Sequence, residues 1–116
     1  MINKLYDIYI SGPMTGQPEF NYPLFNKTAE VLRSYGYVVF NPAECFEGRT
    51  DLPKEVYMRE DIRAVVDSRL VVTLPFWVES PGALLEVEVA KACGISVISF
   101  EEFIKEEALG LGRINV

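Results

Sequence analysis

Apolar residues recur along the chain with two different periods. Short apolar runs rich in β-branched and aromatic residues are typical of buried strands, whereas apolar residues three and four positions apart are typical of amphipathic helices. The runs predict strands over residues 5–10, 37–40, 70–74 and 95–99. The helical spacing predicts helices over residues 22–35, 56–68, 83–93 and 100–108. Because strands and helices alternate, we expect one α/β domain spanning residues 1–116, with a doubly wound parallel sheet covered on both faces.

Three connections are expected to surround a ligand site. They follow the first three predicted strands and cover residues 11–21, 41–55 and 75–82. A doubly wound sheet binds its ligand where the carboxyl ends of the strands open into such loops. The second connection is longer than a usual strand-to-helix loop and is therefore a candidate lid.

Composition narrows the chemistry that the chain can carry. The 116 residues have a net charge of −6, which opposes binding to long nucleic acid. Histidine is absent, which excludes catalytic Ser-His-Asp and Cys-His systems and any imidazole metal ligand. Cys45 and Cys93 lie too far apart in sequence to form a Cys-x-x-Cys pair. With no long apolar run or secretory signal, we expect a cytoplasmic protein without a membrane segment. We also expect neither a metal nor an organic cofactor.

Two carboxylates fall inside the apolar stripes of predicted helices. At 100° per residue, Glu86 lies between Ala90 and Cys93, and Asp61 lies on the apolar side of its own helix. Buried carboxylates are rare without partners, so two of them beside rim loops suggest a shared site. A helix N-terminus also favours the ionised form of Glu86. The alternative is structural: Glu86 would bind backbone donors, and Asp61 would pair with a nearby arginine.

Several motifs, taken in order and spacing, resemble a known family. They are Tyr9-Ile10-Ser11-Gly12-Pro13, Asn41-Pro42-Ala43-Glu44, Tyr57-Met58-Arg59-x-Asp61 and Ser80-x-Gly82-x-x-x-Glu86. The pattern is similar to that of the nucleoside 2-deoxyribosyltransferase superfamily and its related 2'-deoxynucleoside 5'-phosphate N-hydrolases. Short phage and bacterial members resemble it most, over about residues 5 to 99. The resemblance implies a flavodoxin-like fold and a homo-oligomer.

The resemblance also implies roles for three side chains. Glu86 would be the nucleophile, Asp61 the acid near the base and sugar, and Tyr9 the hydroxyl that holds the glutamate. Cleavage of an N-glycosidic bond builds positive charge on the sugar, and an ionised carboxylate stabilises and captures that carbon. A second, protonated carboxyl can donate to the departing base. Water as acceptor makes a hydrolase, and a second base makes a transferase.

Substrate contacts are expected from the rim loops. The residues are Ser11, Gly12, Met14, Thr15, Gly16, Phe20, Asn21, Trp77, Ser80 and Gly82. Ser80 resembles the phosphate hydrolases, but the first loop lacks their arginine, so a phosphate would depend on hydroxyls, amides and Arg49. Phe20 and Trp77 either stack on a base or cover the core. Asn21 either binds ligand or caps a helix.

Two other functions stay open on the sequence alone. A non-catalytic nucleotide-binding module would keep the same pocket without turnover. A flavin-binding electron carrier shares the fold but needs a phosphate loop richer in serine and threonine. The favoured ligand is a small nucleoside or nucleotide.

Overall fold

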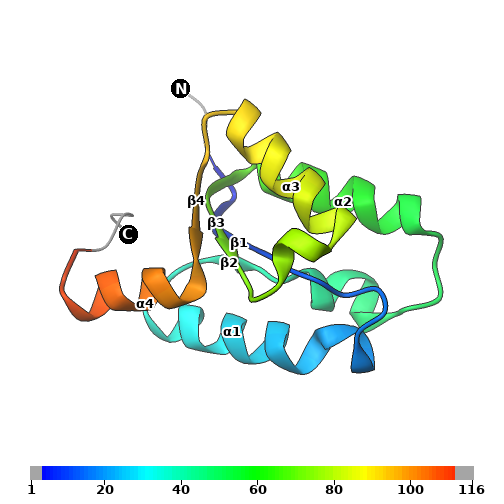
Figure 1. Ribbon diagram of the computed structural model, residues 1–116, viewed down its shortest axis with the longest axis horizontal. Helices are drawn as coiled ribbons and strands as arrows, with labels where there is room; N and C mark the ends of the chain where they lie inside the picture. The colour runs from blue at the N-terminus through cyan, green and yellow to red at the C-terminus, as the bar shows by residue number, and fades with distance from the viewer. Residues whose placement is uncertain (1–3, 112–116) are drawn as a thin grey trace.

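Four parallel strands form one sheet in the order β2-β1-β3-β4 in the computed structural model, which describes residues 4–111 (Figure 1). The strands are β1 (Tyr6–Ser11), β2 (Val39–Phe40), β3 (Ser68–Thr73) and β4 (Ser96–Ser99). On β1, Ile8 pairs with Val39 on one side and Leu70 on the other. The chain therefore runs from β1 to β2 on one side of β1 and then returns to β3 on its other side. This reversal between β1 and β3 confirms the predicted flavodoxin-like α/β fold.

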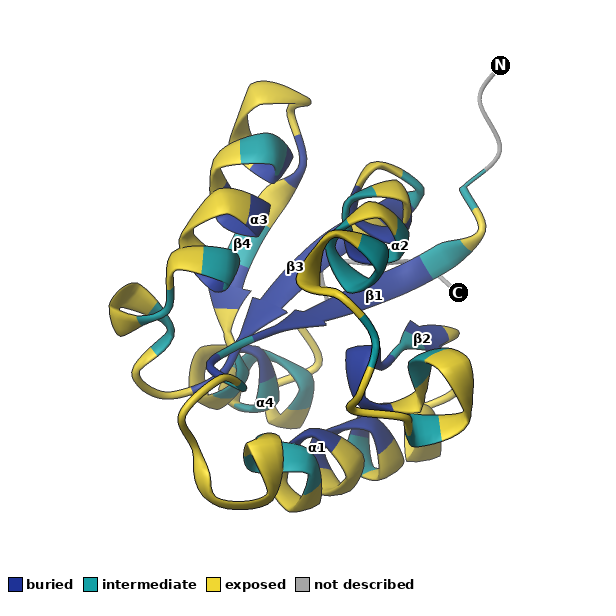
Figure 2. Ribbon diagram, turned by 90° about the vertical axis from the view of Figure 1, so that its right-hand side faces the viewer, coloured by how far each residue is buried: buried dark blue, intermediate teal, exposed yellow. Residues whose placement is uncertain are grey.

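Four α-helices cover the sheet in two layers. They are α1 (Tyr22–Ser34), α2 (Lys54–Val66), α3 (Pro81–Ala92) and α4 (Phe100–Ala108). Helices α1 and α4 cover one face, and α2 and α3 lie side by side on the other (Figures 1 and 2). Alternate residues of β1 serve the two layers: Ile8 and Ile10 pack with Phe25, whereas Tyr9 packs with Val65. The central strands are thus buried on both faces, as the continuous apolar runs predicted.

The predicted boundaries differ from the observed ones around α2. The connection expected to be irregular contains the 3₁₀ segment η2 (Pro42–Gly48), and α2 begins at Lys54, two residues early. The helix predicted to reach Ser68 ends at Val66, and Ser68 starts β3 instead. Ser68 can be buried there because its hydroxyl donates to a carbonyl in the last turn of α2, at 2.6 Å. Strand β2 is two residues shorter than predicted.

Candidate active site

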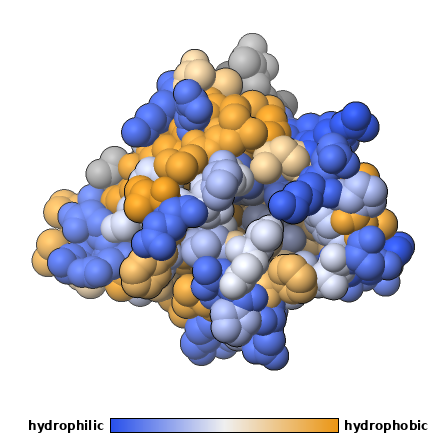
Figure 3. All heavy atoms as spheres, turned by 45° about the vertical axis from the view of Figure 1, so that its right-hand side comes forward, coloured by the Kyte–Doolittle hydropathy of each residue, from blue (hydrophilic) through white to orange (hydrophobic). Residues whose placement is uncertain are grey.

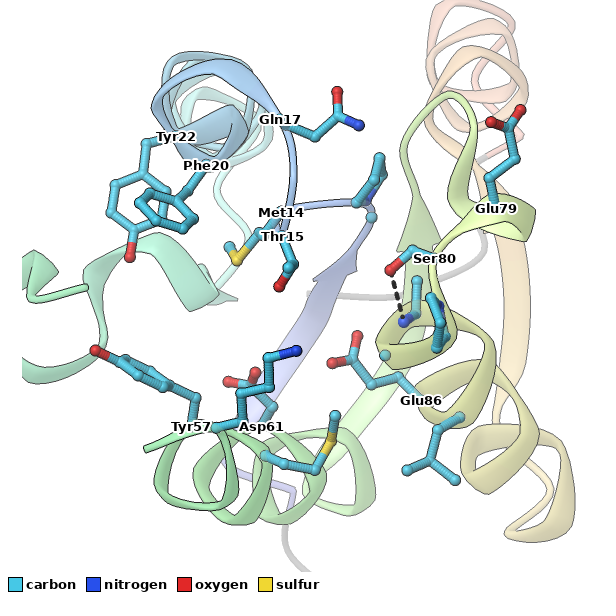
Figure 4. Close-up of a pocket in the computed structure, with 18 of the residues that line it drawn as sticks. Met14, Thr15, Gln17, Phe20, Tyr22, Tyr57, Asp61, Glu79, Ser80 and Glu86 are labelled. Atoms are coloured by element: carbon cyan, nitrogen blue, oxygen red, sulfur yellow. Dashed lines mark hydrogen bonds between the residues drawn. The ribbon is translucent and has the colours of Figure 1, made fainter. Parts of the chain in front are cut away.

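A cavity of about 810 Å³ opens at the carboxyl ends of the strands (Figure 4). Its walls are the loop after β1, the first turns of α2, and the start of α3 with the loop before it. Figure 3 shows a hollow on this face with apolar side chains gathered beside it. The position is the switch in strand order, where doubly wound sheets bind ligands, and the volume suits a small molecule of nucleotide size.

Glu86 faces this cavity from the second turn of α3. Its side chain is buried, and its Oε1 accepts a hydrogen bond from the Ser11 hydroxyl at 2.7 Å. The start of α3 is fixed by Ser80, whose Oγ accepts from the Ala83 amide at 3.3 Å, and by Pro81 in the first turn. This fixed start puts Glu86 on the inner face of the helix, toward the end of β1.

Gly12 allows the chain to pass close to β3 immediately after Ser11. A Cβ at this position would lie 2.8 Å from the Cβ of Leu74, closer than two carbons pack. The absence of a side chain therefore lets the first loop turn over the sheet edge while Ser11 stays beside Glu86.

The Tyr9 hydroxyl lies next to this pair and influences the pKa of the Glu86 carboxyl. Tyr9 is fully buried, and burial, followed by the charge of Glu86, raises its pKa well above the ordinary value. The hydroxyl slightly lowers the pKa of Glu86, yet it forms no hydrogen bond of regular geometry. Among residues 4–111 it is the one buried side-chain oxygen or nitrogen without such a partner. Ser11, two positions along the same face of β1, adds a hydrogen bond of regular geometry to Glu86, and the holding role of Tyr9 stays a prediction.

Asp61 lines the cavity from α2 and is also buried. Its Oδ1 lies 3.7 Å from the Cys45 sulfur, which donates a weak thiol hydrogen bond. The structural explanation offered Arg59, Arg63 or Arg69 as the partner of Asp61. Arg63 pairs with Glu60 and Arg69 with Asp7, and Arg59 forms no ion pair with Asp61 among the described residues. Asp61 thus has a ligand-facing position and no arginine of the described chain beside it.

Burial raises the pKa of both carboxyl groups. The pKa of Asp61 rises to about 7, mainly because the group is removed from water, while the Cys45 thiol lowers it slightly. The pKa of Glu86 rises to about 8, first through burial and then through the negative charge of Asp61. The Ser11 hydrogen bond opposes that rise. Because the two acids interact, they titrate as a pair that holds about one proton near neutral pH.

Most of the expected substrate contacts lie at the cavity. Its lining includes both acids and the predicted loop residues Gly12, Met14, Thr15, Phe20, Ser80 and Gly82. Tyr9 and Ser11 lie behind the lining, where Ser11 bonds Glu86. Figure 4 shows Asp61 and Glu86 reaching the cavity from different helices.

Besides Ser11, three predicted contacts do not line the cavity. Gly16 occupies a left-handed turn at φ 83°, which directs the loop but presents no side chain. The Asn21 amide donates to the Pro13 carbonyl at 3.0 Å and so stabilises the first loop, without capping α1. Trp77 lies in the 3₁₀ turn η3 (Trp77–Glu79), and the preceding Phe76 lines the cavity in its place. Arg49, the other candidate phosphate contact, is likewise outside the lining, and it pairs with Asp51 at 3.0 Å.

The structure adds cavity residues that the sequence did not single out for ligand contact. Lys54, Tyr57 and Met58 share the cavity-facing side of α2 with Asp61, and their spacing of three, four and seven residues is the signal that could have found them. Lys54 lies before the predicted start of this helix at residue 56.

Two other kinds of functional feature are absent from the described residues. Within residues 4–111, no three or more histidine, cysteine, aspartate or glutamate side chains gather in a way that could hold a metal ion. Over the same residues, no helix is both long and apolar enough to cross a membrane.

The fold and the cavity define a flavodoxin-like α/β domain with a pair of buried carboxylates at its switch point. The family described as "Domain of unknown function (DUF4406)" matches residues 6–99, from β1 to the end of β4. The chain belongs to this family. A comparison with curated proteins finds no match.

Proposed function

We propose that the protein cleaves the N-glycosidic bond of a (2'-deoxy)nucleoside or its 5'-monophosphate, with Glu86 as the nucleophile. The observation that carries the proposal is the position of Glu86, buried beneath the cavity and hydrogen-bonded through Oε1 to Ser11. The resemblance of the motifs around Tyr9, Asp61 and Glu86 to nucleoside 2-deoxyribosyltransferases supports the same reaction.

The proposed reaction has two steps. An oxygen of ionised Glu86 forms a bond to C1' while the bond from C1' to the base nitrogen breaks, and the base takes that electron pair. Asp61, in its protonated form, gives its proton to the departing base. In the second step water or a new base attacks C1', Asp61 takes up the released proton, and the bond to Glu86 breaks.

The raised pKa values give the pair the single proton that the two roles require. The nucleophile must be ionised and the acid protonated, which together require one proton on the pair. Burial and mutual repulsion keep one proton on the two carboxyls near neutral pH. With the pKa of Glu86 the higher of the two, the reactive arrangement is a minor protonation state of the free protein.

A bell-shaped pH profile is the expected result for kcat/KM. Activity should rise as Glu86 ionises and fall as Asp61 loses its proton, with apparent pKa values near 7 and 8 that belong to the pair. Initial rates of base release between acidic and alkaline pH measure the profile. Asp61→Asn should lower the rate and abolish the alkaline limb, because the proton whose loss causes that limb is no longer present at position 61. An alkaline limb that persists in this variant would assign that limb to another group.

Base release is the direct test of the proposed function. The purified protein would be incubated with purine and pyrimidine nucleosides and with their 5'-monophosphates, and free base would be measured by chromatography. Adding a second base to each reaction separates transfer from hydrolysis. If no base is released or exchanged while calorimetry still detects binding, the protein is the non-catalytic nucleotide-binding module.

Nucleosides and monophosphates place different demands on the cavity. Ser80 and Thr15 offer hydroxyls that can donate to a phosphate. The start of α3 also forms the cavity wall beside Ser80, and the N-terminus of a helix favours a bound phosphate. Carboxylates in the same lining would repel a phosphate; they belong to Asp61, Glu79 and Glu86. The proposal therefore includes nucleosides and 5'-monophosphates, and the base-release assay compares the two.

We also propose that the protein works as a homo-oligomer in the cytoplasm. Leu84 and Leu85 of α3 are 44% and 43% exposed beside the cavity, a pattern that favours association with another surface. Sedimentation equilibrium measures the assembly.

A further inference from the structure

Lys54 brings an unpaired cation to the α2 wall of the cavity. It is the first residue of α2, and its side chain is exposed. Of the described residues that line the cavity, it is the only lysine or arginine. Its ammonium group forms no ion pair within residues 4–111, whereas Arg49 and Arg63 nearby each pair with an acid. Lys54 is therefore free to bind a ligand.

The position of Lys54 relative to Asp61 determines which part of a ligand it can reach. Lys54, Tyr57 and Asp61 follow one another along the same side of α2, and Figure 4 shows Tyr57 and Asp61 on the wall opposite Glu86. Seven residues of helix advance about 10 Å, so Lys54 lies at the outer end of a wall whose inner end is Asp61. A base that receives a proton from Asp61 at its glycosidic nitrogen would extend along this wall toward Lys54.

At that outer end, the α2 group that is free to hydrogen-bond a ligand is a donor. An ammonium group has three donors and no acceptor. The neighbouring Tyr57 hydroxyl already donates to the Arg49 carbonyl at 2.7 Å and accepts from the Leu52 amide at 3.2 Å. The α2 side of this outer end thus offers a free charged donor, which suits a carbonyl oxygen and gives an amino group no acceptor from Lys54.

We propose that Lys54 selects nucleosides whose base carries a carbonyl oxygen on the edge far from the glycosidic nitrogen. These are 4-oxopyrimidine and 6-oxopurine nucleosides, in preference to those with an amino group at the same position. The inference rests on the proposed function, because the direction of the base is set by Asp61 acting as its acid. Lys54 is accordingly a specificity-determining residue of the base end of the cavity.

Matched pairs of nucleosides test this selection through binding, without need of turnover. Calorimetry would give dissociation constants for 2'-deoxyuridine against 2'-deoxycytidine and for 2'-deoxyinosine against 2'-deoxyadenosine. We expect the oxo member of each pair to bind about tenfold more tightly, the effect of one charge-assisted hydrogen bond. Lys54→Met should remove the preference by weakening the oxo members, and Lys54→Arg should keep most of it. Lys91→Met, at an exposed position of α3 outside the cavity, is the matched control and should keep the full preference.

The other outcomes separate this inference from the proposed function. If the nucleosides bind but Lys54→Met leaves the oxo preference unchanged, the role of Lys54 is wrong and the proposed function stands. If Lys54→Met weakens 5'-monophosphates alone, Lys54 binds phosphate and the orientation of the base is reversed. If none of the nucleosides or monophosphates binds or releases base, the proposed function fails and the selection fails with it.

Discussion

Glu86→Gln is expected to reduce the rate of base release by at least about 10³-fold, because the amide cannot form the glycosyl-enzyme bond. The substitution keeps the shape of the side chain, and the amide oxygen can still accept from the Ser11 hydroxyl. Nucleoside affinity should therefore change little, which separates loss of chemistry from loss of the cavity. Rates from the chromatographic assay and dissociation constants from calorimetry give the two quantities.

Glu88→Gln is the matched control for this substitution. Glu88 belongs to the same helix and is exposed, outside the cavity. The same chemical change at that position should leave both rate and affinity near their wild-type values. A trapped covalent adduct provides a second readout, since mass spectrometry of the wild-type protein with a slow substrate should find the sugar on a peptide containing Glu86. If Glu86→Gln turns over at the wild-type rate, Glu86 is not the nucleophile.

The period of a helix made the two acids predictable from sequence. A side chain's face is set by its position in the helix, so Glu86 and Asp61 could be assigned to the buried side before any tertiary contact was known. The strands were also predictable from sequence, because strands buried on both faces are continuous apolar runs with few polar residues. Even an error of two residues at the start of α2 did not change the face on which Asp61 lies.

Contacts that depend on tertiary placement were less predictable. Tyr9 and Ser11 point to the same face of β1, and only the position of α3 decides which hydroxyl bonds Glu86. Phe76 lines the cavity instead of Trp77 because Phe76 adopts a left-handed backbone, at φ 66°, that sequence does not reveal for a residue other than glycine. Lys54 was missed because α2 begins directly after Pro53, with no side-chain cap to mark it.

The buried charge of Glu86 should also make the protein less stable at alkaline pH. Its pKa is 4.5 in an ordinary carboxyl and about 8 in the folded protein, so between these values the folded state binds more protons than the unfolded state. The free energy of unfolding then falls as pH rises through this window, and it levels off above the folded pKa. Below the ordinary pKa, both states are protonated and the penalty disappears. The site thus carries a cost in stability that grows from about pH 4.5 upward and reaches its full size once Glu86 is ionised in the folded protein.

Glu86→Gln is therefore expected to stabilise the protein at pH 9 by on the order of 3 kcal/mol, and to have little effect at pH 4. The shift in pKa that sets this value already includes the opposing hydrogen bond from Ser11. Urea unfolding of both proteins at several pH values measures the difference. Glu88→Gln should show no such dependence, since Glu88 is exposed. A difference between wild type and Glu86→Gln that is constant with pH would mean that Glu86 ionises in the folded protein as it does in water.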